Sequence, residues 1–113
     1  MPLADRVLID TSAFYALVSD IDSFHERASE TYQRIVDWNQ ELWTTSYVLV
    51  ETLALIHRRM GYSAIVQFED SLARHLHIFW IESTVHSEAW RRLVATQGVG
   101  MGFVDWTTVL AST

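Results

Sequence analysis

The sequence predicts an α/β fold with a parallel central sheet and helices on both of its faces. Short apolar runs alternate along the chain with longer segments of helical periodicity. Strands that alternate with helices pair in parallel, because each helix returns the chain to the start of the next strand. The 113 residues are enough for one domain, 1–113, and half of them are hydrophobic, which provides for one buried core.

The first half of the chain contains two predicted strands. The segment 6–12 is an apolar run closed by a carboxylate and two hydroxyls, which is typical of a buried strand that leads directly into a helix. Apolar residues at helical spacing predict an amphipathic helix over 23–38. A second strand is predicted at 42–45, and Ser46 is the expected N-cap of a largely buried helix that ends near Gly61.

The second half repeats this alternation. A helix is predicted from Tyr62 or Ser63 to about residue 74, followed by a strand over 77–81. Ser83 or the threonine after it is expected to cap the next helix, which runs to about residue 96. A glycine-rich turn then precedes a last helix over 103–111, and we expect the chain to end inside it.

Composition and charge exclude several classes of function. The chain has no cysteine, which excludes disulfides, thiolate metal sites and a cysteine nucleophile. Its net charge of −6 has the wrong sign for binding nucleic acid by phosphate neutralisation alone, although a bound divalent cation would reverse the local sign. No segment approaches the roughly 20 apolar residues of a membrane span, and no signal peptide is recognised, so we expect a cytoplasmic protein.

Three carboxylates stand at positions that suit a ligand site. Asp10 follows the first predicted strand, Glu51 lies in a helix that is apolar nearly all round, and Asp105 lies near the start of the last helix. Each has a structural alternative: Asp10 could cap a helix, Glu51 could pair with an arginine, and Asp105 could interact with the helix dipole. Together they are better explained as oxygen ligands of Mg²⁺ or Mn²⁺, which would assist phosphodiester hydrolysis.

These acidic motifs, taken in order, resemble those of the PIN-domain family. The resemblance rests on the segments 7–12, 46–51 and 102–105, which keep the family's order and spacing over essentially the whole chain. The segment 20–25 adds a similarity to small prokaryotic PIN proteins, the VapC-type toxins of toxin-antitoxin pairs. The fold that this resemblance implies is a PIN-like three-layer α/β/α arrangement with a parallel central sheet.

The resemblance also implies a function for individual residues. Asp10, Glu51 and Asp105 would be the catalytic acids and the ligands of Mg²⁺ or Mn²⁺, and Thr11 and Ser12 would help to position the site or the substrate. The implied activity is that of a metal-dependent endoribonuclease acting on RNA. The implied partners are an antitoxin protein and a second copy of the chain in a homodimer.

The sequence departs from the family's pattern at its C-terminal side. The family commonly carries a fourth acid after a further strand, and this chain has no residues there. We therefore expect a sheet without its last one or two strands, whose first strand has an exposed edge. The expectation is that the natural protein continues past Thr113, or that another chain covers this edge.

Two other readings of the function stay open. The first is a PIN-like domain that no longer cleaves and serves as an RNA-binding or protein-binding module. The second is a receiver-type signalling domain, in which a strand-end aspartate accepts a phosphoryl group. The absence of lysine from the sequence argues against the second, because the receiver pattern includes a late lysine.

The remaining aromatic and basic residues have simpler explanations. The arginine pairs at 58–59 and 91–92 are predicted to be solvated helix residues rather than phosphate ligands, and the histidines show no spacing typical of zinc ligands. Most of the five tryptophans fall in apolar runs, so we expect them in the core rather than as platforms for base stacking. They are Trp38, Trp43, Trp80, Trp90 and Trp106.

Overall fold

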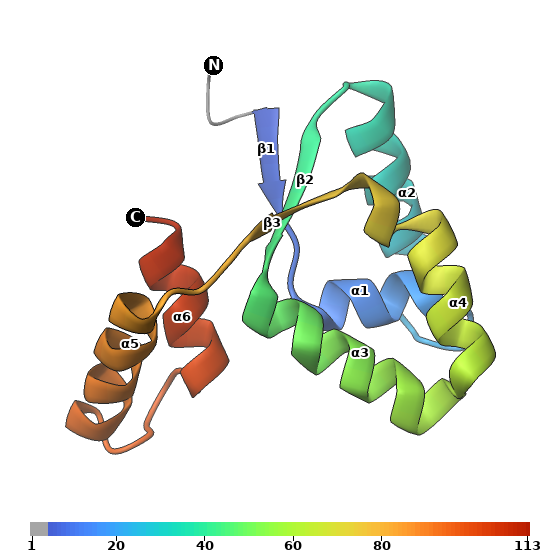
Figure 1. Cartoon of the computed structure of the whole chain (residues 1–113). Helices are drawn as coiled ribbons and strands as arrows, with labels where there is room; N and C mark the ends of the chain where they lie inside the picture. Colours follow the sequence, from blue (N-terminus) through green and yellow to red (C-terminus); the bar gives the residue numbers. More distant parts are fainter. Residues whose placement is uncertain (1–4) are drawn as a thin grey trace.

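The fold is built on a three-stranded parallel sheet. The structure is a computed structural model, and it describes residues 5–113. Strands β1 (Arg6–Leu8), β2 (Glu41–Thr45) and β3 (Leu76–Phe79) pair in the order β1-β2-β3, and both pairs are parallel (Figure 1). The predicted α/β class and the parallel sheet are therefore confirmed.

Within residues 5–113, six α-helices connect and flank these strands. After β1 come α1 and α2, after β2 come α3 and α4, and α5 and α6 follow β3 as a helical hairpin set apart from the other four (Figure 1). A short 3₁₀ segment, Ala73–His75, precedes β3. The bounds are α1 Thr11–Val18, α2 His25–Asp37, α3 Ser46–Met60, α4 Tyr62–Ser71, α5 Ser83–Ala95 and α6 Phe103–Ala111.

The hydrophobic core lies between one face of the sheet and helices α1 to α4. Leu42 of β2 points into it, and Ile56 of α3 is fully buried. The ring of Phe14 in α1 meets the ring of Phe68 in α4 edge to face, with centroids 5.4 Å apart, and both side chains are essentially inaccessible to solvent. Side chains alternate between the faces of a strand, so this core uses every second residue of each strand.

The opposite face of the sheet is largely open in the part of the chain that the structure describes. Leu8 and Phe79, which lie on this face, are 46% and 40% exposed. Between them the ring of Trp43 is stacked on His77 at 5.0 Å, with the Arg6 guanidinium 5.3 Å from its centroid. The α5–α6 hairpin lies beyond the carboxyl ends of the strands and does not cover this face (Figure 1).

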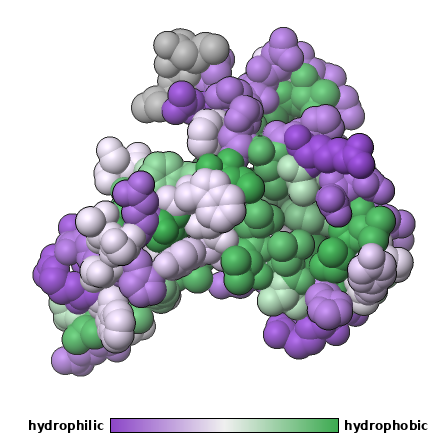
Figure 2. Space-filling model, in the orientation of Figure 1, coloured by the Kyte–Doolittle hydropathy of each residue, from purple (hydrophilic) through white to green (hydrophobic). Residues whose placement is uncertain are grey.

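The outer edge of β1 carries no further strand within residues 5–113, as the sequence led us to expect. A groove of about 620 Å³ runs beside this edge and is lined mainly by β1, α1 and α2. Figure 2 shows hydrophobic residues gathered over the centre of the face that is in view, around α1. The expectation that a further segment or another chain covers this edge stays a prediction.

Two predicted N-caps lie one or two residues after the observed ones, and the chain continues past the end of the last helix. Thr45, rather than Ser46, caps α3, because its Oγ1 accepts a hydrogen bond from the Val48 amide at 3.1 Å. At α5 the N-cap is Glu82, which makes no side-chain capping bond. The last helix ends at Ala111 with Ser112 as its C-cap, so the described chain does not end inside it.

The prediction that most tryptophans are buried was wrong. Trp38, Trp80 and Trp90 are 68%, 68% and 60% exposed. Trp38 and Trp80 directly follow α2 and β3, and Trp90 lies on α5, where fewer elements pack around the chain. None of the helices in residues 5–113 has the length and hydrophobicity to span a bilayer.

Candidate functional site

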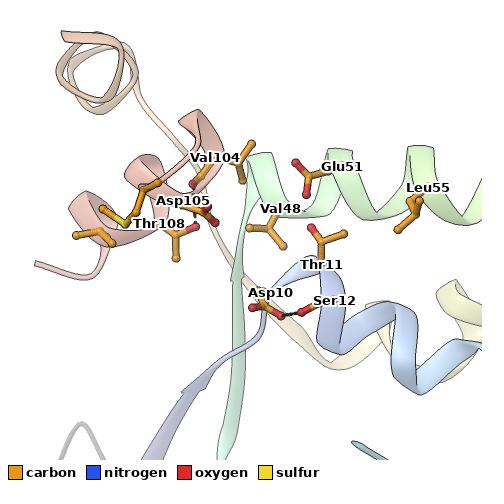
Figure 3. Close-up of a pocket in the computed structure, with 11 residues that line it drawn as sticks. Asp10, Thr11, Ser12, Val48, Glu51, Leu55, Val104, Asp105 and Thr108 are labelled. Carbon is orange, nitrogen blue, oxygen red and sulfur yellow. Dashed lines mark hydrogen bonds between the residues drawn. The ribbon is translucent and has the colours of Figure 1, made fainter. Parts of the chain in front are cut away.

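A pocket opens at the carboxyl ends of the strands, where α1, α3 and α6 meet. Its volume is about 520 Å³, and all five residues that the sequence singled out, Asp10, Thr11, Ser12, Glu51 and Asp105, line it (Figure 3). In a parallel α/β sheet this end is where ligands bind. The structure thus brings together side chains that lie up to 95 residues apart in the sequence.

Asp10 is held in the pocket by the end of β1. The Ile9 amide donates to the Trp43 carbonyl at 2.8 Å, and the Ile9 carbonyl accepts from the Thr44 hydroxyl at 3.0 Å. Asp10 is also the N-cap of α1, because its Oδ1 accepts from the Ala13 amide at 3.0 Å. Asp10 therefore caps α1 and also lines the pocket. Its second carboxylate oxygen, Oδ2, could bind a ligand there.

Glu51 reaches the pocket from the second turn of α3. It is exposed, and no arginine forms an ion pair with it among residues 5–113, so the alternative of a buried pair with arginine is not supported. The expectation that α3 lacks a solvent face was wrong, because the neighbouring Val50 is 67% exposed. Figure 3 shows the Glu51 carboxylate on the side of α3 that looks across the pocket.

Asp105 is the third residue of α6. Its Oδ2 accepts from the Gly102 amide at 3.3 Å and so stabilises the start of the helix. Because this bond uses Oδ2, Oδ1 could serve as a ligand, just as Oδ2 could at Asp10. The side chain is exposed toward the pocket and stands across it from Asp10 and Glu51 (Figure 3).

The two hydroxyl residues have different partners: Ser12 bonds to Asp10, and Thr11 bonds to a threonine of α3. The Ser12 hydroxyl donates to Asp10 Oδ1 at 3.0 Å and fixes the rotation of that carboxylate. Thr11 accepts a hydrogen bond from the Thr52 hydroxyl at 3.4 Å, and Thr52 is fully buried beside Glu51. Thr52 was not predicted from the sequence, and it joins the start of α1 to α3.

The apolar wall of the pocket was also missed. It consists of Val48, Leu55, Met101, Val104 and Val109, and the polar Thr108 lies beside it. Helical spacing could have found several of them, because Val48 and Leu55 lie three residues before and four after Glu51 on the same side of α3. Thr108 likewise lies three residues after Asp105.

The donors of the pocket suit a hard divalent cation, although they do not converge on one point. Among residues 5–113 no three acidic or histidine side chains lie close enough together to hold a metal ion. Carboxylate and hydroxyl oxygens are nevertheless the ligands that Mg²⁺ and Mn²⁺ prefer, and these ions keep several waters of their own. The unused oxygens of Asp10 and Asp105, with the Glu51 carboxylate, form a donor set of that kind.

The arginine pair on α5 is engaged by an acid on the same helix. Glu88 accepts hydrogen bonds from Arg91 and, at 3.1 Å, from Arg92 Nε, and the Arg92 guanidinium also lies 5.5 Å from the Trp106 ring centroid. These bonds, chiefly the two from Arg91, lower the pKa of the Glu88 carboxyl from 4.5 to about 2 and raise the pKa of Arg91. The contacts of Arg91 and Arg92 fit the prediction that they are structural helix residues rather than phosphate ligands.

We expect Glu88 to make stability depend on pH in the acid range. A carboxyl whose pKa falls on folding stabilises the native state above its unfolded pKa, so this contribution is complete above pH 4.5 and is lost as the pH falls toward 2. Urea unfolding at pH 6 and pH 3 should show that Glu88→Gln destabilises the protein more at pH 6 than at pH 3, because pH 3 lies between the two pKa values. Because the side chains are partly exposed, 0.5 M salt should reduce the difference. An equal effect at both pH values would contradict this.

The fold and the pocket define a class of protein. The family model of the PIN domain matches residues 7–106, which span β1 through the first half of α6 and include all three acids. The chain therefore belongs to the PIN-domain family, as its motifs suggested. The predicted PIN-like α/β fold is confirmed by this match.

The structure is also similar to a solved member of the VapC toxins. The crystal structure of VapC20 from Mycobacterium tuberculosis, described as a sarcin-ricin loop cleaving toxin, superposes with a TM-score of 0.72 at 26% sequence identity. The match covers 93% of this chain and 78% of that one. A search of curated proteins found no match.

Proposed function

We propose that this protein is a metal-dependent endoribonuclease, the toxin of a toxin-antitoxin pair that acts in the cytoplasm. The observation that supports it best is that Asp10, Glu51 and Asp105 all line one pocket at the carboxyl ends of the strands. Membership of the PIN family and the similarity to a loop-cleaving VapC toxin support the same chemistry. RNA is the proposed substrate, and an antitoxin and a second copy of the chain are the proposed partners.

In this proposal the three acids would hold Mg²⁺ or Mn²⁺ in the pocket. A bound cation of this kind supplies an activated water and offsets negative charge that develops on the phosphate. Asp10 would be kept in one orientation by the Ser12 hydroxyl and the Ala13 amide, which leaves Oδ2 free to act as a ligand. The ion would also explain how a chain of net charge −6 can hold a polyanion at an acidic pocket.

The other residues of the pocket would orient the substrate. Thr11, fixed by its contact with Thr52, presents a hydroxyl beside Asp10 that can donate to phosphate or ribose oxygens. The exposed Ser12 hydroxyl donates to Asp10, and its oxygen can accept a hydrogen bond from a ribose hydroxyl. Val48 and Leu55 form an apolar wall next to Glu51.

A catalytically inactive PIN-like binding module is the second proposal. The observation that favours it is the spread of the acids, since no group of three lies close enough for a metal ion in residues 5–113. In that case the pocket would bind RNA or a protein without cutting it. The two proposals differ in whether the protein cleaves RNA when a divalent cation is present.

The test is cleavage of a mixed RNA pool, with a sarcin-ricin loop oligonucleotide as one component, in the presence of Mg²⁺ or Mn²⁺. We expect the protein to cut RNA, EDTA to stop the reaction, and Asp10→Asn to lower the rate by at least about 100-fold, because a metal ligand matters more than the outer residues that orient it. Glu69→Gln is the matched control, since Glu69 is an exposed acid on α4 outside the pocket.

The outcomes separate the proposals. Loss of cutting in Asp10→Asn but not in Glu69→Gln supports the nuclease. RNA binding with no cutting in either Mg²⁺ or Mn²⁺ would favour the binding module. Equal cutting by the protein and its Asp10→Asn variant would remove Asp10 from the site.

A further inference from the structure

The position of Asp105 depends on how the α5–α6 hairpin is fastened to the rest of the molecule. The hairpin lies to one side of the sheet, and its principal packing on the other elements is between α6 and α3 (Figure 1). Asp10 and Glu51 belong to the main body, whereas Asp105 belongs to the hairpin. A small rotation of the hairpin would therefore move one of the three acids relative to the other two.

An aromatic cluster lies at this junction and joins three helices. The hydroxyl of Tyr47 in α3 is 2.6 Å from His86 Nδ1 in α5, and the two rings are almost perpendicular, with centroids 5.8 Å apart. The ring of Phe103, the first residue of α6, lies 6.0 Å from Tyr47 and 5.1 Å from His86. All three side chains are half-buried, so the hydrogen bond is partly shielded from water.

Two of these residues lie on the same helix as one of the acids and within about one turn of it. Tyr47 lies four residues before Glu51, and residues at this spacing share one side of a helix. Phe103 lies two residues before Asp105, at the start of the same helical turn. The cluster therefore links the part of α3 that presents Glu51 to the part of α6 that presents Asp105, with His86 as the hydrogen-bonding partner between them.

We infer that Tyr47 and His86 are positioning residues, whose hydrogen bond, packed against Phe103, sets the place of Asp105 opposite Glu51 and Asp10. A phenol hydroxyl donates to Nδ1 when the imidazole is neutral and carries its proton on Nε2. The bond has a defined direction and length, which apolar contacts alone lack. This inference rests on the proposed function, since it concerns the cation that the three acids would hold.

The test measures Mn²⁺ binding by the electron paramagnetic resonance signal of free Mn²⁺, without RNA. We expect Tyr47→Phe and His86→Leu to raise the Mn²⁺ dissociation constant about tenfold, the lower end of the 10- to 100-fold effect of outer residues that orient ligands. His86→Asn, which keeps an acceptor near the position of Nδ1, should restore much of the affinity. Tyr62→Phe is the matched control, because Tyr62 is 75% exposed on α4.

A second readout follows the junction itself without metal. The Ile81 amide, in the link before α5, donates to Ser46 Oγ at 2.9 Å next to Tyr47. We expect this amide to exchange its hydrogen several-fold faster in Tyr47→Phe than in Tyr62→Phe. Amides of β1 and α1 should be unchanged in both variants.

Each outcome decides the inference. Weaker Mn²⁺ binding in Tyr47→Phe and His86→Leu, with recovery in His86→Asn, supports it, and unchanged Mn²⁺ affinity in the first two variants overturns it. If the unmodified protein binds no Mn²⁺, the metal part of the proposed function fails. The Ile81 exchange rate then decides alone whether the pair fixes the hairpin, with an unchanged rate overturning the inference.

Discussion

Replacing Glu51 by Gln is expected to reduce metal-dependent RNA cleavage by at least about 100-fold while leaving the fold intact. Gln keeps the size of the side chain and removes its charge, and Glu51 is exposed and makes no ion pair within residues 5–113 that the substitution would break. Single-turnover cleavage at saturating RNA, measured over a range of Mn²⁺ concentrations, provides the rate. The melting temperature should stay within about 2 °C, because surface substitutions seldom change stability by more than about 0.5 kcal/mol.

The control for this prediction lies on the same helix. His57→Gln changes an exposed residue in the last turn of α3, away from the pocket, and should leave the cleavage rate unchanged. A Glu51→Gln variant as active as the unmodified protein would show that the carboxylate is not part of the reacting site. Loss of activity together with loss of the fold would instead assign Glu51 a structural role.

Replacing Phe68 by Ala is expected to produce the largest loss of stability, about 3–5 kcal/mol. The Phe68 ring is 1% exposed and meets the buried Phe14 ring edge to face, so its removal leaves a cavity between α1 and α4. Domains of this size are stable by only about 5–15 kcal/mol, so a large part of the folding free energy would disappear. Urea unfolding followed by far-ultraviolet circular dichroism measures the change.

Phe24→Ala provides the matched comparison, because that ring is 61% exposed. We expect it to cost less than about 1 kcal/mol, as is usual for surface substitutions. Similar losses in both variants would contradict the placement of the core between the sheet and α1 to α4. A loss at Phe24 alone would place an additional element over that ring.

Much of the fold could be predicted from local pattern. The strands over 42–45 and 77–81 were placed to within two residues, and the helix over 103–111 was placed at its observed bounds, Phe103–Ala111. These elements have strong sequence signals. β-Branched and aromatic runs are typical of strands, and the glycine-rich turn marks where the last helix begins. The position of the acids in one pocket followed from the rule that the carboxyl ends of parallel strands share one edge of the sheet.

Burial on the helices could not be predicted in the same way. The apolar residues of α3 lie on more than one side, which suggested that neighbours surround it, yet Val50 is 67% exposed. Periodicity shows which residues share a face but not which face another element covers. Trp90 is exposed for the same reason, because α5 packs mainly on α6 rather than on the sheet.

The details of the site required contacts between distant segments. The Thr52 hydroxyl meets Thr11, and the Tyr47 hydroxyl meets His86 39 residues along the chain, and neither pair has a sequence spacing that marks it. Thr45 caps α3, whereas Ser46, the residue predicted for that role, instead accepts a hydrogen bond from the Ile81 amide. Two adjacent hydroxyl residues are equivalent as caps until such a tertiary partner is known.

The most direct measurement is a crystal of this protein soaked in Mn²⁺, with anomalous diffraction used to locate the ion. We predict an anomalous peak in the pocket within coordination distance, about 2.0–2.6 Å, of carboxylate oxygens of Asp10 and of at least one of Glu51 and Asp105. The Asp10→Asn protein, soaked identically, should lack that peak. Mn²⁺ bound only elsewhere on the surface, or an undiminished peak in Asp10→Asn, would contradict the proposal that these acids form the metal site.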